Sequence, residues 1–514
     1  MSWTDTLLEA LPWGTSHRGG PYPPDGGLAL ARNKPGLPAL GEPISEVPLP
    51  EQLVLPLINY AKLTLEPTCQ VGDRVKLGDS IAPGVIAPAD GVISAIEPRA
   101  LLHPSHHKAA CVVIDVHAQG EHKQQALPAL DTLDIERIER AGINGLGGAG
   151  FATSAKLQAA ASAPAGIDTL IINAVECEPL ISCDEALIRS DANSVALAIE
   201  AAISYSQCRN CIIAIEDDKT EALTELESSL QGLPESCFDK LQLVRLSAIY
   251  PSGAEKVLVQ RLTGRRLVGT QKASDFGIVC LNVATVVAAW RAQRGYPMIS
   301  RIVTIAGNAA SKLTNVRVRF GTPVSHVLEH TGNACPTTTT RVRAGGPLSG
   351  FDLPDTAVPI LSTTNCIAIE PSAPAIRSAE CIRCNQCSDV CPVNLVPQQL
   401  FWYARRDDLA AASRFGLDDC IQCGCCDLVC PSFIELTSMF RHTKSAGQEQ
   451  QRRNHEAELA RERFEKREAR EAQRQKDAQE KRNQRRKELA SAKDPIAEAL
   501  ARSKARAAAR RDSK

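Results

Sequence analysis

Two copies of one cysteine pattern constrain this 514-residue chain more than any other feature. The first copy is Cys381, Cys384, Cys387, Cys391 and Pro392, and the second is Cys420, Cys423, Cys426, Cys430 and Pro431. Each reads C-x₂-C-x₂-C-x₃-C-P, a spacing with which bacterial proteins ligate [4Fe–4S] clusters. Zinc ribbons and disulfides are the alternatives, but zinc needs only four sulfurs, usually from two separated C-x₂₋₄-C pairs. The third closely spaced cysteine of each copy therefore favours two iron–sulfur clusters.

The same spacing predicts how the ligands are shared. Three cysteines on a tight loop reach three irons of a cube, and the fourth iron faces away from that loop. When two such runs are paired, the fourth cysteine of each completes the cluster of the other. We therefore expect one cluster on Cys381, Cys384, Cys387 and Cys430 and a second on Cys420, Cys423, Cys426 and Cys391. Cys425 is out of register with the pattern and is expected not to be a ligand.

The charge of the chain is nearly balanced but unevenly distributed. The formal net charge of −1 argues against nucleic-acid binding by the whole chain. Residues 451–514 hold 21 Lys and Arg and 12 Asp and Glu, a net +9, which leaves −10 for the remainder. The 19 cysteines occur in a long chain without a basic segment after Met1, so a reducing cytoplasm is expected. The longest largely apolar run, 277–290, is too short to span a bilayer.

Pattern changes along the chain predict a multidomain protein of α/β and β units. Residues 1–45 are punctuated by Pro and Gly and are expected to form an extended arm. Residues 46–125 contain short alternating strand patterns, and V-G-D-x-V-x-x-G-x-x-I followed by A-P-x-D-G-x-I resembles the barrel-sandwich modules of lipoyl and biotinyl carriers. Such carriers need a lysine on the exposed hairpin, which 86–93 lacks, so a structural β module is expected.

Residues 130–295 alternate between strand and helix patterns, which predicts an α/β layer with a mostly parallel sheet. The expected strands are 169–173, 211–215, 241–246 and 278–283. Residues 296–350 predict a small α+β unit, and 365–440 a helical domain around the cysteines. Residues 445–514 are rich in Arg, Lys, Glu, Gln and Ala, which predicts a solvated helix or disordered tail. The alternative is a basic arm that contacts anionic lipid or an acidic partner.

Four polar turns predict a second chemical site. The glycine-rich segment 145–151 (G-L-G-G-A-G-F) leads toward a helix, with Lys156 following. Its backbone N–H groups would suit an anion, although many such loops are ligand-free turns. N-A-V-E-C-E-P (173–179), Y-P-S-G-A-E-K (250–256) and N-V-A-T (282–285) each follow an expected strand. Because open α/β sheets bind ligands at the carboxyl ends of their strands, a nucleotide or flavin site is favoured over four unrelated loops.

These four motifs resemble those of the FMN- and NADH-binding subunit of respiratory complex I. Their order, with the β module, the cysteine runs and the charged tail, more fully resembles the RnfC family, a component of the Rnf complex. That complex is a membrane-bound, ion-translocating electron-transport assembly between NADH and ferredoxin. The resemblance extends from about Gly19 into the tail. It implies a barrel-sandwich β module, an α/β FMN/NADH-binding domain, a β-grasp-like unit and a two-cluster ferredoxin-like domain.

The resemblance also implies roles for individual residues. Those that would hold the FMN phosphate and ring are Gly145, Gly147, Gly148 and Lys156, with Asn173 and Glu176 contacting the flavin. Those on the nicotinamide side are Glu178, Tyr250, Gly253 and Glu255, while Asn282 and Thr285 would close the flavin pocket. Complex I has acidic residues where this chain has Val175 and Ala254, so its nucleotide contacts differ.

By this resemblance the chain is an electron-input subunit, peripheral to the cytoplasmic face of the bacterial inner membrane. FMN would take a hydride from NADH, and the two [4Fe–4S] clusters would pass single electrons to an iron–sulfur partner subunit. The other partners implied are further subunits of the membrane complex, with no nucleic acid and with membrane contact either indirect or through the basic tail. Two alternatives remain: a non-enzymatic iron–sulfur relay with a purely structural glycine loop, and the flavin subunit of a soluble NAD-linked hydrogenase or formate dehydrogenase.

Overall fold

The computed structural model describes residues 22, 24–30, 40, 42–58, 64–104, 107–117, 129, 134–163, 166–333, 339–372, 377–491 and 495–511. The chain divides into two compact units, Met1–Arg441 and His442–Lys514. Most of the arm expected at 1–45 lies outside the described residues. Among the helices of the described ranges, none has the length and apolarity needed to cross a membrane.

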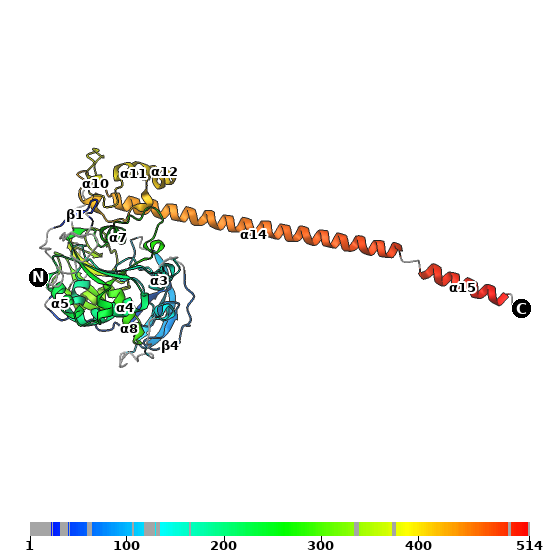
Figure 1. The fold of residues 1–514 in the computed structure, drawn as a ribbon, viewed down its shortest axis with the longest axis horizontal. Coiled ribbons are helices and arrows are strands. Elements are labelled where there is room, and N and C mark those ends of the chain that lie inside the picture. The colour runs from blue at the N-terminus through cyan, green and yellow to red at the C-terminus, as the bar shows by residue number, and fades with distance from the viewer. Residues whose placement is uncertain are drawn as a thin grey trace. The chain divides into compact units, whose positions relative to one another are not determined.

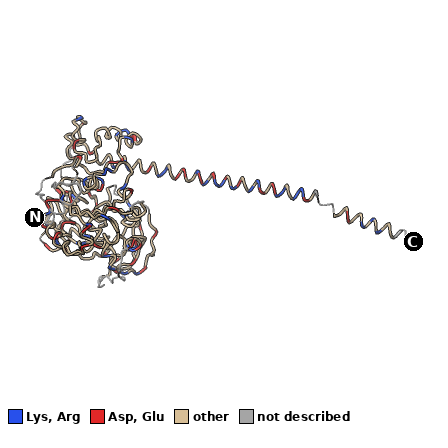
Figure 2. Tube along the Cα trace, in the orientation of Figure 1, with Lys and Arg blue, Asp and Glu red and all other residues tan. Residues whose placement is uncertain are grey.

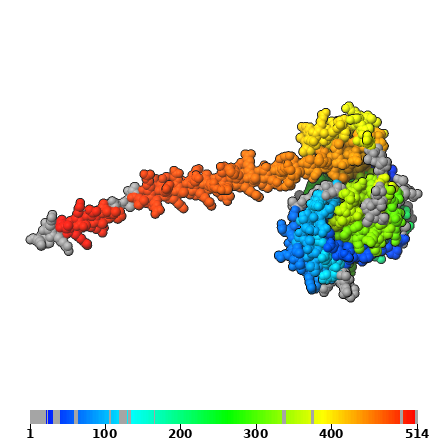
Figure 3. Space-filling view, turned by 180° about the vertical axis from the view of Figure 1, so that it is seen from behind, coloured from blue at the N-terminus to red at the C-terminus, as the bar shows by residue number. Residues whose placement is uncertain are grey.

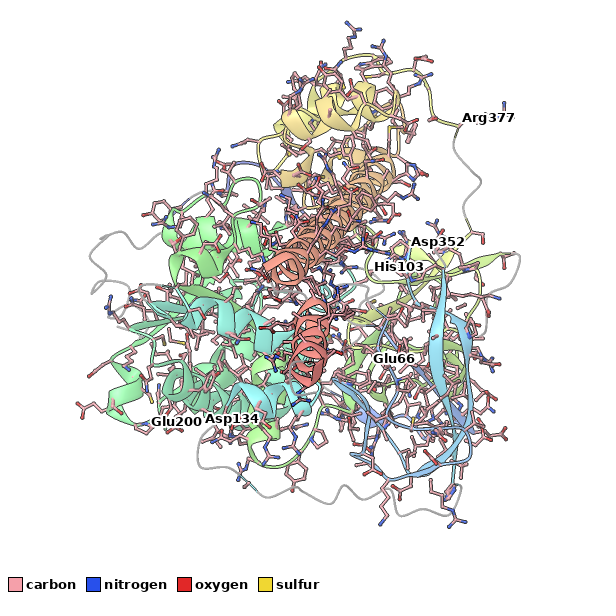
Figure 4. All side chains as sticks on the ribbon, turned by 90° about the vertical axis from the view of Figure 1, so that its right-hand side faces the viewer. Glu66, His103, Asp134, Glu200, Asp352 and Arg377 are labelled. Atoms are coloured by element: carbon pink, nitrogen blue, oxygen red, sulfur yellow. The ribbon has the colours of Figure 1, made fainter. Side chains whose placement is uncertain are left out.

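The expected β module is an antiparallel sheet in the order β3 (Gln52–Pro56), β8 (Lys108–Val116), β7 (Gly91–Ala100) and β4 (Arg74–Val75). A hairpin of β5 (Ser80–Ala82) and β6 (Val85–Ile86) accompanies it. Alternate side chains turn inward, so that Leu53, Ile93 and Ile114 are completely buried in one apolar core. Figure 4 labels Glu66 and His103 in this module, and Glu200 and Asp134 in the α/β layer on the other side of the view.

The α/β layer is a parallel sheet in the order β11 (Leu241–Leu246), β10 (Asn210–Glu216), β9 (Thr169–Ala174) and β13 (Ile278–Asn282). All four expected strands are therefore present, and every pairing is parallel as predicted. Helices α4 (Cys183–Ser206), α5 (Thr220–Leu230) and α8 (Val283–Gln293) pack on one face of the sheet, and α7 (Glu255–Thr263) packs on the other (Figure 1). Burial on both faces explains why these strands are continuously apolar.

A mixed six-stranded sheet follows, in the order β17 (Phe351–Asp352), β16 (Thr340–Ala344), β18 (Cys366–Pro371), β14 (Ser300–Ala306), β15 (Thr314–Arg319) and β2 (Ser45–Glu46). Helix α9 (Val324–His330) covers its core. β18 lies beyond the range 296–350, so this sheet takes in more of the chain than the sequence pattern indicates. The Val54 N–H donates to the Gly321 carbonyl at 3.0 Å, which joins this sheet to the β module (Figure 3).

Short helices carry the cysteine runs: α10 (Gln386–Asp389), α11 (Pro397–Ala404), α12 (Leu409–Arg414) and α13 (Cys425–Leu428). Helix α14 runs from Leu436 to Ser491, and α15 spans Pro495–Arg511. Within the second unit, basic and acidic side chains alternate along α14 (Figure 2) and pair at helical spacing, as Arg461 does with Glu465 at 2.8 Å. The tail is thus helical, one of the two forms expected.

Candidate functional site

The eight expected cluster ligands gather around two cavities. The first cavity, of about 390 Å³, is lined by Cys381, Cys384, Cys387 and Cys430. The second, of about 340 Å³, is lined by Cys420, Cys423, Cys426 and Cys391. Each cavity therefore receives three cysteines from one run and the fourth from the other run. Cys425, which is buried, also borders the second cavity.

Both runs fold by the same local device. The residue before the second cysteine has a positive φ in each run, 58° at Arg383 and 56° at Gln422. The residue after that cysteine also lies in the left-handed region, with φ of 67° at Asn385 and 80° at Gly424. Asn and Gly adopt this conformation at low cost. Two left-handed residues curl each loop so that its three cysteines turn toward one cavity.

Backbone donors surround the sulfurs that cross between the runs. The Leu395 N–H donates to Cys391 Sγ at 3.3 Å, and the Ile434 N–H donates to Cys430 Sγ at 3.5 Å. The offset of four residues is the same in both runs. Amide donors stabilise thiolate ligands and tune the potential of a cluster. Four sulfurs, amide donors and apolar walls that include Phe401 and Phe440 fit a [4Fe–4S] cluster in each cavity.

The glycine loop exposes its backbone ahead of a helix. Gly147 and Gly148 are exposed, while the Gly145 N–H donates to the Phe151 carbonyl at 2.8 Å and closes the loop. Helix α3 (Thr153–Ala161) then begins without a side-chain cap. Its buried Thr153 hydroxyl has no hydrogen-bond partner among the described residues. Exposed amides, an uncapped helix start and an unpartnered hydroxyl fit a phosphate-bearing group such as FMN.

The loop lies against the carboxyl end of the sheet. The Leu146 N–H donates to Thr285 Oγ1 at 2.9 Å, and a methyl group on Gly147 would lie 3.4 Å from Cβ of Asn282. Asn282 ends β13 and is paired in register with Asn173 at the end of β9. The chain leaves β9 toward β10 on one side, while β13 lies on the other. This is the switch point at which open α/β sheets bind ligands.

A buried acidic cluster lies behind the two asparagines. Glu176 accepts hydrogen bonds from the Asp184 N–H at 2.9 Å and the Glu185 N–H at 3.2 Å, at the start of α4. Asp184 in turn accepts a bond from Asn282 Nδ2 at 2.5 Å. Burial, and then the neighbouring Glu176 carboxylate, raises the pKa of Asp184 to about 7. The sequence analysis missed Asp184, although its position in the first turn of α4 was a signal.

Other expected residues are placed differently. Lys156 Nζ contacts Glu255 Oε2 at 2.5 Å and the Cys280 carbonyl at 2.8 Å, so its charge is paired beside β13. Gly253 joins two motifs: its carbonyl accepts from Asn173 Nδ2 at 2.9 Å, and its N–H donates to Cys177 Sγ at 3.3 Å.

Glu178 and Tyr250 lie at the junction with the second cysteine run. Glu178 accepts hydrogen bonds from the Leu348 N–H at 2.8 Å and the Ser349 N–H at 3.1 Å, and burial raises its pKa against these bonds. The Tyr250 hydroxyl donates to the Cys423 carbonyl at 2.6 Å. The turn at Leu348 was not singled out in the sequence, because it carries no side chain with a recognisable pattern.

Three family models match successive parts of the chain. They are the RnfC barrel sandwich hybrid domain at residues 25–119, the Nuo51 FMN-binding domain at 138–291 and the 4Fe-4S dicluster domain at 380–434. The matches cover the β module, the α/β layer with its glycine loop, and both cysteine runs. The chain thus contains an FMN-binding domain and a domain for two [4Fe–4S] clusters.

Curated relatives match most of the chain. The RnfC protein of the ion-translocating oxidoreductase complex of Pseudomonas aeruginosa is 37% identical over 465 residues, or 86% of this chain and 58% of the relative. The proteins of the same name from Yersinia enterocolitica and Pasteurella multocida are also 37% identical, over 88% and 82% of this chain and 64% and 52% of the relatives. The chain thus spans about half to two-thirds of their length. Among solved structures, an NAD⁺-reducing [NiFe]-hydrogenase in the H₂-reduced state superposes with a TM-score of 0.43 and 18% identity, over 61% of this chain and 62% of that one.

Proposed function

The chain is a homologue of the RnfC proteins of the ion-translocating oxidoreductase complexes, and we propose that it is the electron-input subunit of such a complex. It would carry electrons between NADH and partner subunits, coupled in the complex to cation transport. The observation that carries this proposal is the occurrence, in one compact unit, of the FMN-binding domain and the two four-cysteine cavities.

Each part of the site has a task in this proposal. FMN, when bound, converts the two-electron hydride of NADH into single electrons that a cluster accepts. The exposed amides of Gly147 and Gly148 would bind its phosphate, and Asn173 and Asn282 would orient its ring at the edge of the sheet. The eight cavity cysteines would hold the clusters, and the surrounding apolar side chains would exclude water from them. The sheet built on β14 and β18 is proposed to be the β-grasp-like unit.

We further propose that electrons leave through the first cavity to an iron–sulfur partner subunit at the cytoplasmic face of the membrane. Cys384 is exposed, and Ile382 beside it is 68% exposed, so this ligand loop is accessible to another protein. A short gap between clusters is needed for electron exchange, and an exposed apolar rim is typical of surfaces that other proteins contact.

The tail is proposed to contact the anionic surface of the membrane. Residues 481–511 hold eleven Lys and Arg against three Asp and Glu. The preceding part of α14 is different, because its arginines pair with glutamates at helical spacing, as Arg467 does with Glu471 at 2.9 Å. Paired charges stabilise an isolated helix, whereas a net positive segment attracts anionic lipid by about 1 kcal/mol per basic residue near the surface.

The test is anaerobic reconstitution with iron, sulfide and FMN, followed by titration with NADH. A flavin absorbance near about 450 nm is expected to bleach on addition of NADH. Gly147→Ala is expected to fold but to lose flavin, because its methyl group would narrow the loop against Asn282. Gly232→Ala is the matched control, since its methyl group would make only an ordinary contact with the Ser229 carbonyl at 3.5 Å. Clusters without flavin or NADH response would favour the non-enzymatic relay instead.

A further inference from the structure

We infer that Tyr250 and Lys256 are positioning residues that fix the second ligand loop, residues 419–424, against the flavin domain. The cluster of the second cavity is then the one that exchanges electrons with the flavin, and the cluster of the first cavity faces the partner. This inference rests on the proposed function and adds the order of the clusters and the residues that set it.

The first contact comes from Tyr250, the last residue of strand β12 (Ile249–Tyr250). Its side chain is only 4% exposed, and its hydroxyl donates to the Cys423 carbonyl at 2.6 Å. Cys423 lines the second cavity. A buried hydroxyl bonded to the backbone of a ligand fixes that ligand without touching the metal, as outer-shell groups do at other metal sites.

The second contact lies six residues further along the chain. Lys256 Nζ forms an ion pair with Asp419 Oδ1 at 2.8 Å, and the same oxygen accepts from the Gly269 N–H at 2.6 Å. Asp419 immediately precedes Cys420, the first ligand of the run. The two side chains of the ion pair are 22% and 19% exposed, so water screens this pair less than a surface pair. Both ends of the ligand loop are thereby tied to one segment of the flavin domain.

A third segment packs beside the loop. Gly424 has φ of 80°, and a methyl group there would come within 2.5 Å of the Leu348 carbonyl. The N–H of Leu348 donates to Glu178, which itself lies in the N-A-V-E-C-E-P turn of the flavin domain. The loop is therefore enclosed between the Tyr250 segment and the Leu348 turn.

The fourth ligand of the second cavity is anchored to the same place. A methyl group on Gly26 would lie 2.7 Å from the Cys391 carbonyl, and the Gly27 N–H donates to the Val390 carbonyl at 3.0 Å. These glycines lead into β1 (Leu28–Ala29), in which Leu28 pairs with Tyr250. Every ligand of the second cavity thus belongs to a segment fixed on the flavin domain.

The first ligand loop has no such fastening. Among the described residues, no hydrogen bond or ion pair joins 381–387 to residues 134–293. Its Cys384 is exposed, whereas Cys391 and Cys425 beside the second cavity are buried. The asymmetry assigns the inner position to the second cluster and the outer position to the first. It also gives Tyr250 a task at the cluster rather than at the nucleotide.

The experiment compares Tyr250→Phe with Tyr205→Phe in the full chain reconstituted with iron, sulfide and FMN. Tyr205, in α4, loses the same hydroxyl at a site without cysteine ligands. Iron content and the reduction potential of each cluster are measured by EPR-monitored titration. Cys384→Ala as a background leaves the second cluster alone, so a shift can be assigned to it.

Tyr250→Phe is expected to keep its iron and to lower the potential of the second cluster only, because a donor dipole aimed at Cys423 is lost. Lys256→Met is expected to act on the same cluster and serves as the second variant if Tyr250→Phe does not fold. Unchanged potentials in both variants, equal shifts in both clusters, or an effect confined to NADH affinity would each overturn the inference. A chain that binds no flavin would refute the proposed function, yet its cluster potentials would still report on Tyr250.

Discussion

Cys384 and Cys391 belong to the same run but line different cavities, and this gives a sharp test of the shared ligand sets. Each cavity has four sulfurs from the pattern, so removal of one leaves three and destabilises one cluster. Cys384→Ala should disrupt the first cluster and Cys391→Ala the second. In each case about four of about eight irons per chain are put at risk. Reduction of the flavin by NADH should survive in Cys384→Ala, because that residue lies outside the flavin domain.

The assay is iron analysis together with EPR of the reduced protein. Cys391→Ala should reproduce the spectrum of Cys423→Ala, and Cys384→Ala that of Cys430→Ala. Cys425→Ala is the matched control, since this buried cysteine is out of register with the pattern and should leave both signals in place. If each run held its own cluster, Cys384→Ala and Cys391→Ala would lose the same signal. That result would refute the crossed ligand sets.

Two further predictions concern pH and the tail. Because the pKa of Asp184 rises from 3.8 to about 7 on folding, the native state holds a proton that the unfolded chain releases, so stability should fall as pH rises from about 4 to about 7. Asp184→Asn should remove this slope and gain up to about 4 kcal/mol at neutral pH, measured by denaturant unfolding; an unchanged slope would exclude Asp184 as its source. Neutralising four unpaired basic residues should weaken sedimentation with anionic vesicles, whereas neutralising four paired arginines should not. The first set is Arg482, Arg485, Arg486 and Lys487 and the second Arg452, Arg453, Arg461 and Arg467; equal effects, or equal binding to neutral vesicles, would contradict the proposal.

Repeated local patterns made parts of this protein predictable. The strands at 169–173 and 278–283 are apolar runs between turn residues, and burial on both faces of a parallel sheet requires that pattern. The sharing of cysteines between cavities follows from spacing alone, because a tight loop reaches only three corners of a cube. Positions of the glycine loop and of Asn282 beside it follow from the rule for switch points.

Long-range pairings could not be predicted. Lys256 and Asp419 are 163 residues apart, and Tyr250 and Cys423 are 173 apart. Nothing in the local sequence of either partner indicates the other. The high pKa of Asp184 is similar, since an acid in the first turn of a helix is ordinarily exposed and favourable there. Only its burial beside Glu176 reverses that expectation.

The N-A-V-E-C-E-P turn explains why these distant contacts matter for the site. Asn173 lies at the sheet edge with Asn282, and Glu176 accepts from the start of α4, so the first half of the turn serves the flavin side. Glu178, two residues later, binds the Leu348 turn that packs against Gly424 of the second run. One rigid turn therefore touches both the expected flavin pocket and the support of the second cluster. Because electron transfer depends on the gap between the centres, a turn fixed at both ends sets that gap by covalent geometry rather than by the docking of two independent domains.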